Sequence, residues 1–202
     1  MMTLERMMAI PKSDLQEASK ALRKDDIPQL IEWLALKDDN SRYQAFLLLQ
    51  SRSLLLDDVY PHWETFGSKL KSGNSYQRSI GLMLIAENAK WDAENRIGGI
   101  IDECLTLLND EKPITVRQCI QSLGKIASAK PGLQDKIASG LLSLNLMAVK
   151  ETMRKSILLD ILNVLLIIRQ EHKSDEIEGF ILRALSGEIL DKKSKKQIEA
   201  LL

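Results

Sequence analysis

Apolar and polar positions alternate with helical spacing along most of this chain. In the stretch DNSRYQAFLLL (39–49), polar residues that suit a helix start precede Arg42, and Ala45 and Leu49 follow it after three and seven residues. Residues with these spacings share one face of a helix, as a buried face requires. No run of β-branched residues alternates with polar ones, so the sequence predicts helices and no strands.

A basic residue recurs near the start of five such segments, at intervals of 36, 39, 37 and 41 residues. This basic column consists of Arg42, Arg78, Arg117, Arg154 and Lys195. A second amphipathic segment precedes each member, and residues typical of turns and caps separate the segments. A period near 40 residues built from two helices is typical of a helical solenoid.

The repeated pattern resembles the HEAT-repeat family of armadillo-type solenoids. Second helices in that family open with a polar turn, a Val-Arg-like pair and a small residue three positions later. TVRQCI (115–120) is the best match, and DNSRYQA (39–45) and NSYQRSIG (74–81) are recognisable. The fourth and fifth units depart from the pattern, with Met153 before Arg154 and with Lys195 in place of arginine.

The resemblance implies an all-α fold, a right-handed α-α superhelix of about five HEAT-like helix pairs. Residues 1–25 would form an N-terminal capping segment, with one helix over roughly 13–24, and residues 26–202 would form the array. The predicted repeats are approximately 26–57, 58–92, 93–130, 131–172 and 173–202.

Two interpretations of the basic column remain open. In the first, the column is a ligand-binding stripe. In the second it is a structural ladder, in which each member joins its repeat to a carbonyl or carboxylate of a neighbouring repeat. We favour the ladder, because a guanidinium forms several bonds at once and a nearest-neighbour interface uses one such residue per repeat. Asp160 is then expected to be the acidic partner of one rung.

The second helices also suggest where a partner binds, because in HEAT-like solenoids they line the concave surface. If residues three and seven after each basic residue face the core, residues two, five and nine face away from it. This set contains no Lys or Arg, so it suits an apolar helix or peptide better than phosphates. The candidate partner-binding residues are Leu47, Ile80, Met83, Ile126, Leu159 and Asn163. Alternatively, neighbouring helices enclose these positions and they belong to the core.

Composition narrows the class of partner further. Lys+Arg and Asp+Glu both number 28 in 202 residues, so no net charge attracts nucleic acid or an anionic membrane. Glu5 and Arg6 interrupt the N-terminal apolar residues, which argues against a signal peptide. The longest apolar run, 156–168, is shorter than the roughly 20 residues of a membrane span. Two cysteines without paired spacing fit a reducing compartment, so we predict a soluble, cytoplasmic protein.

The sequence contains no convincing catalytic motif. His62 and His172 are far apart in the sequence, and neither has the neighbouring Cys or His of a metal-binding motif. RIGGIID (96–102) lacks the Lys-Ser/Thr of a phosphate-binding loop. Cys119 has no nearby residue that could act as a base. We therefore predict no enzymatic activity, no metal and no cofactor. The predicted function is a scaffold or adaptor that binds another protein through its concave face or terminal edge. The apolar end IEALL (198–202) also makes a homodimer through the C-terminal edge conceivable.

The alternative is a nucleic-acid-acting protein that resembles the HEAT-like alkylpurine DNA glycosylases. Those enzymes place tryptophans and an aspartate on a strongly basic concave face. This chain has Trp33, Trp63 and Trp91, and KWDAENR (90–96) joins a tryptophan to an acid. However, Trp33 and Trp63 fall on apolar helix faces, and no basic cleft is apparent, so nucleic acid is the less favoured partner.

Overall fold

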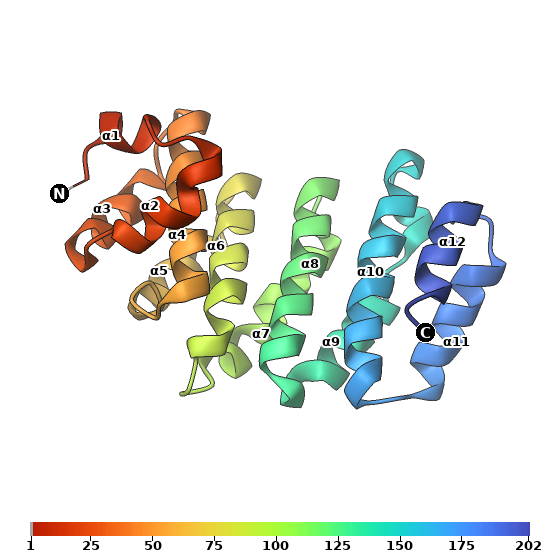
Figure 1. Cartoon of the computed structure of the whole chain (residues 1–202). Helices are drawn as coiled ribbons and strands as arrows, with labels where there is room; N and C mark the ends of the chain where they lie inside the picture. Colours follow the sequence, from red (N-terminus) through yellow and green to blue (C-terminus); the bar gives the residue numbers. More distant parts are fainter. Residues whose placement is uncertain (1) are drawn as a thin grey trace. The chain divides into compact units, whose positions relative to one another are not determined.

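The computed structural model describes residues 2–202, and no strand occurs among them. The chain forms two compact units, Met1–Asn95 (unit 1) and Arg96–Leu202 (unit 2). Both units combine long helices with shorter ones (Figure 1). No helix within residues 2–202 combines the length and apolar character needed to cross a bilayer.

Unit 1 is built around the long helices α4 and α6, with shorter helices packed against them. Each long helix begins at a capping side chain: Asp38 accepts a hydrogen bond from Ser41 N at 2.7 Å, and Asn74 accepts one from Tyr76 N at 2.9 Å. The α-helices are α1 Leu4–Met8, α2 Leu15–Ala21, α3 Ile27–Trp33, α4 Asp39–Leu55, α5 Trp63–Lys69 and α6 Ser75–Asn88. Short 3₁₀ turns lie at η1 Lys12–Asp14, η2 Lys24–Asp26, η3 Tyr60–His62 and η4 Ala89–Trp91.

The core of unit 1 consists of the apolar faces predicted from helical spacing. Trp63 and Phe66 of α5 are buried, as are Ala45 and Leu49 of α4. Gly81 of α6 allows α5 to approach closely, because a Cβ atom there would lie 2.6 Å from the carbonyl oxygen of Phe66. The predicted single capping helix is corrected, since the N-terminal segment contains α1 as well as α2.

Unit 2 is centred on α8 and α10, which lie side by side in extensive contact (Figure 1). Pro113 fixes the first position of α8, where its missing N–H has no cost. The α-helices are α7 Arg96–Thr106, α8 Pro113–Ala129, α9 Gln134–Leu142, α10 Glu151–Glu171, α11 Asp175–Ser186 and α12 Lys192–Glu199. Its 3₁₀ turns are η5 Leu107–Asn109, η6 Pro131–Leu133 and η7 Leu146–Ala148.

The core of unit 2 is formed by apolar side chains of α8 and α10, with α9 packed against both. Ile120, Leu123, Ile161 and Leu165 are fully buried. The predicted core face is wrong at Leu202, which is exposed because α12 ends at Glu199, before that residue could join its buried face.

Candidate functional site

The basic column mostly stabilises the turn that precedes each long helix. Arg42 Nη1 donates to Leu36 O at 2.9 Å, Arg78 Nη1 to Ser72 O at 2.7 Å, and Arg154 Nε to Val149 O at 3.0 Å. Each acceptor lies five or six residues before its arginine, within the same predicted repeat. These hydrogen bonds correct the predicted ladder, because their carbonyl acceptors belong to the arginine's own repeat. Arg42 also reaches the next predicted repeat, where its guanidinium lies over the Tyr76 ring at 5.2 Å from the ring centroid.

Arg117 behaves as the ladder predicts. Its Nε donates to Asp160 Oδ2 at 2.6 Å and its Nη2 to Asp160 Oδ1 at 3.2 Å, which joins α8 to α10. Gln121 donates to the same carboxylate at 3.1 Å. The hydrogen bond from Arg117 to Asp160 raises the pKa of the guanidinium. Asp160 is therefore the acidic partner that the sequence predicted. Lys195 makes no side-chain hydrogen bond or ion pair with residues 2–202.

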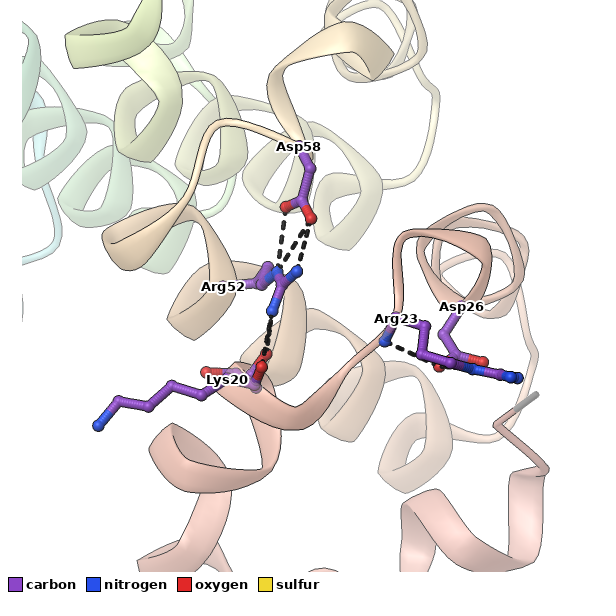
Figure 2. Close-up of polar contacts among 6 residues, drawn as sticks. Lys20, Arg23, Asp26, Arg52 and Asp58 are labelled. Carbon is purple, nitrogen blue, oxygen red and sulfur yellow. Dashed lines mark hydrogen bonds and ion pairs between the residues drawn. The ribbon is translucent and has the colours of Figure 1, made fainter.

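A buried arginine outside the basic column bonds to three residues of unit 1. Arg52, near the end of α4, is 4% exposed, and its Nη2 lies 2.7 Å from Asp58 Oδ2. Its Nη1 donates to the carbonyl oxygens of Ser19 and Lys20 at 2.8 and 3.0 Å. Figure 2 shows Arg52 between Asp58 and Lys20, so one side chain connects α2, α4 and the segment before α5.

Sequence reasoning missed this site because its partners are distant in the chain. The one available signal was an arginine three residues after the core residue Leu49, on a face that should be apolar. Nearby, Asp26 accepts a hydrogen bond from the backbone nitrogen of Met2 at 2.6 Å. It accepts another from the backbone nitrogen of Arg23 at 3.1 Å (Figure 2). These contacts hold the N-terminal segment to α3.

The tryptophan–acid pair of KWDAENR is part of a polar cluster within unit 1. Trp91 Nε1 donates to Ser53 O at 2.8 Å, and Asp92 accepts from the hydroxyl of Tyr60 at 2.8 Å. Asn88 Nδ2 donates to Ser53 Oγ at 3.0 Å. Asp92 is fully buried. The cluster therefore connects the ends of α4 and α6, and its carboxylate is covered by protein.

The six candidate partner-binding residues fall into two groups. Leu47, Met83 and Leu159 are half-buried and Asn163 is exposed, so their role stays a prediction. Ile80 and Ile126 are buried, so their predicted contact with a partner is wrong for the folded chain. In α8 the predicted phase is off by one residue, because Cys119 turns towards α7 and its thiol donates to Cys104 O at 3.4 Å.

One side of α10 is open to solvent. Its residues are exposed or half-buried, follow one another at intervals of three and four, and carry no charge. This open stripe consists of Thr152, Ser156, Leu159, Asn163, Ile167 and Gln170. At a rise of about 1.5 Å per residue, it extends over roughly 27 Å of helix.

The charged side chains of α10, apart from Glu151 in its first turn, are engaged within unit 2. They bond to neighbouring segments. The contacts are Arg154 with the carbonyls of Val149 and Met147, Lys155 with Asp191, Asp160 with Arg117, Arg169 with Glu178, and Glu171 with Gln134. The helix uses its charges for internal contacts, and its open stripe remains uncharged.

A cavity of about 240 Å³ lies between α8 and α10 beside this stripe. Gly124, Val164 and Ile167 supply its apolar surface. The remaining lining residues are polar or charged: Gln121, Lys125, Ser128, Asp160 and Asn163. We call this cavity the α8–α10 notch.

The fold is similar to that of several solved helical-repeat structures. An engineered protein solved by the Northeast Structural Genomics Consortium matches 100% of this chain and 96% of its own, with 16% identity and a TM-score of 0.55. A second engineered protein matches 98% of this chain and 51% of its own, with 16% identity and a TM-score of 0.57. No protein-family model matches the sequence, and no curated protein matches it.

Kap121p, a HEAT-repeat karyopherin, matches 98% of this chain with 18% identity and a TM-score of 0.57. The match covers 20% of Kap121p, so this chain spans about a fifth of its length. These likenesses and the helical architecture confirm the predicted fold class, an all-α HEAT-like solenoid. The number of helix pairs stays a prediction.

Proposed function

We propose that this chain is a non-catalytic scaffold or adaptor that binds another protein through its long helices. The observation that carries the proposal is the open stripe of α10, which presents uncharged polar and apolar side chains beside the α8–α10 notch. A protein surface satisfies such groups with hydrogen bonds and apolar contacts. The half-buried Leu47 and Met83 are candidates for a similar role in unit 1.

Nucleic acid is the less favoured partner for physical reasons. Binding to phosphates requires several cations along the contact surface. The open stripe has none, and the three cations of the same helix, Arg154, Lys155 and Arg169, are engaged in internal contacts. Asp92 is the candidate acid of the glycosylase-like alternative. It is buried and accepts a hydrogen bond from Tyr60.

The chemistry of the described residues also supports a binding role. Burial raises the pKa of Cys104 to about 12 and that of Cys119 well above its ordinary value, so neither thiol is an effective nucleophile. Both cysteines are free, which fits the cytoplasmic location that we propose. The karyopherins, whose fold this chain resembles, are protein-binding scaffolds. Because fold alone does not determine function, the surface of α10 remains the main argument.

Site-specific photocrosslinking in a lysate of the native host tests the proposal. A photoreactive phenylalanine analogue at Asn163 samples the open stripe, and the same group at Leu182 samples an exposed position on α11. We expect a discrete protein adduct from position 163 that is absent from position 182. The partner identified in this way should then bind the unmodified chain when both are purified.

The same chain should be titrated with labelled duplex and single-stranded DNA at low salt, with fluorescence anisotropy as the readout. We expect no binding, because the open stripe cannot neutralise phosphates. Tight binding that weakens steeply with salt would contradict the proposal and favour the nucleic-acid alternative. Equal adducts from positions 163 and 182 would also contradict it.

A further inference from the structure

The α8–α10 notch has the size of a site for one side chain. Its volume of about 240 Å³ lies below the roughly 300–1,000 Å³ of pockets that enclose small-molecule ligands. Its base is apolar, because Gly124 has no side chain where α8 meets Val164 and Ile167. A few residues buried in well-packed pockets typically supply most of the binding energy of a protein interface, and the notch has room for one of them.

The polar groups around the notch differ in whether they are already bonded. The carboxylate of Asp160 accepts from Arg117 and Gln121, and Ser128 Oγ donates to Gly124 O at 3.0 Å. Asn163 is exposed, and its amide has no hydrogen-bond partner within residues 2–202. An amide supplies donors and an acceptor together, so it can pair with the peptide groups of a partner.

The charged side chains around the notch are engaged within the chain. Asp160 is paired with Arg117, and Lys125 on the facing helix also has an interaction within the chain. A charged partner group placed here would lose water and find no free counter-charge, which is costly. Charge complementarity therefore selects an uncharged segment.

We infer that the α8–α10 notch binds an uncharged peptide segment of a partner protein. One apolar side chain of that segment would occupy the notch, and a backbone peptide group beside it would pair with the Asn163 amide. The neighbouring open stripe would contact uncharged polar residues on either side of the anchor. This inference rests on the proposed function and specifies the chemistry of the partner.

Selection from a displayed library of random 16-residue peptides tests the inference on the full chain. We expect the enriched peptides to carry a Leu, Ile, Met or Phe anchor flanked by uncharged residues. Lysine or glutamate beside the anchor should weaken binding at least five-fold in synthetic versions. Enrichment of charged peptides, or of none, would overturn the inference.

Two arginine substitutions provide a matched comparison. Asn163→Arg places a charge at the notch, and Ser139→Arg adds the same charge at an exposed position of α9 in the same unit. Asn163→Arg should weaken the selected peptides at least ten-fold, Asn163→Gln should retain most of the affinity, and Ser139→Arg should leave it unchanged. Peptides that bind Asn163→Arg as well as the parent chain would show that they use another surface.

The two proposals fail in different ways. If a purified protein partner binds the chain but Asn163→Arg does not affect it, the notch inference is wrong and the scaffold function stands. If no discrete protein adduct forms from position 163, or if the partner identified there does not bind the unmodified chain, the scaffold function itself is wrong.

Discussion

The two units bury different kinds of chemistry. In unit 1 an ion pair, Arg52 with Asp58, is almost fully covered, and Asn88, Trp91 and Asp92 bond to neighbouring groups close by. In unit 2 the contact of α8 with α10 is mainly apolar, and its ion pair joins the partly exposed Arg117 to the buried Asp160. A buried ion pair tolerates the loss of one partner poorly. Where the lost partner was partly exposed, as Arg117 is, water can replace some of its interactions.

The sequence supplies a separate probe for each unit. All three tryptophans and all three tyrosines lie in unit 1, and both cysteines lie in unit 2. Tryptophan fluorescence therefore reports on the unfolding of unit 1. Because Cys104 and Cys119 are fully buried, their reaction with a thiol reagent reports on the opening of unit 2.

The largest expected difference in stability loss between the two units comes from replacing Arg52 in unit 1 and Arg117 in unit 2 by alanine. Arg52→Ala leaves Asp58 and two carbonyl groups buried without their donor, and should lower the free energy of unfolding of unit 1 by about 3–5 kcal/mol. Arg117→Ala should cost about 1–2 kcal/mol in unit 2, because its side chain is 36% exposed and Gln121 still donates to Asp160. Urea unfolding measured with the two probes tests both values, and equal losses would contradict the comparison.

Two glycines in the long helices give a second, smaller contrast. A Cβ atom at Gly81 would lie 2.6 Å from the backbone oxygen of Phe66, which cannot move without shifting α5. Gly81→Ala should therefore destabilise unit 1 by about 2–3 kcal/mol. At Gly124 the nearest atom is a methyl group of Val164 at 3.0 Å.

Because the Val164 side chain can shift, Gly124→Ala should change the stability of unit 2 by less than about 1 kcal/mol, the gain in helix propensity offsetting the crowding. The same urea measurements report both variants. A greater loss of stability for Gly124→Ala than for Gly81→Ala would contradict this expectation. It would show that the contact of α8 with α10 adapts less to an added methyl group than the contact of α5 with α6.

Alkaline pH should destabilise unit 2 through its thiols. Burial raises the pKa of Cys104 from 9.0 to about 12. The contribution of this thiol to the free energy of unfolding is therefore fully present below pH 9.0 and declines as the pH rises towards 12. At one pH unit above 9.0, the free energy of unfolding should be lower by about 1.4 kcal/mol because of Cys104. Cys119, whose pKa is also raised, should lower it further. Unfolding followed by circular dichroism between pH 8 and 10.5 measures the slope.

Cys104→Ala provides the control for this titration. The free energy of unfolding of the variant should fall less steeply with pH, because one titrating thiol has been removed. Tryptophan fluorescence reports the stability of unit 1 in the same samples and serves as the reference. An unchanged slope would assign the alkaline loss to other groups.

Helical spacing was enough to predict the core positions of α4 and the pairing of Asp160 with a basic residue. It failed where a contact depends on a chain segment far away in sequence, as for Arg52 with Ser19. It also failed for the orientation of α8, where the outward face was predicted one residue too far along the chain. Ser122 is buried, and its neighbour Gln121 is exposed. Asn163 was predicted from spacing alone, but the notch beside it depends on how α8 and α10 meet.

The hydrogen bonds of the basic column also bear on how such a chain can grow by duplication. Arg78 and its acceptor Ser72 lie within one short stretch, so a duplication that copies α5 and α6 copies this contact intact. Arg117 and Asp160 lie 43 residues apart, and a recombination event between α8 and α10 would separate them. A copied repeat therefore keeps the hydrogen bond of its own arginine to the preceding turn, whereas the ion pair between α8 and α10 is kept only when both helices are inherited together.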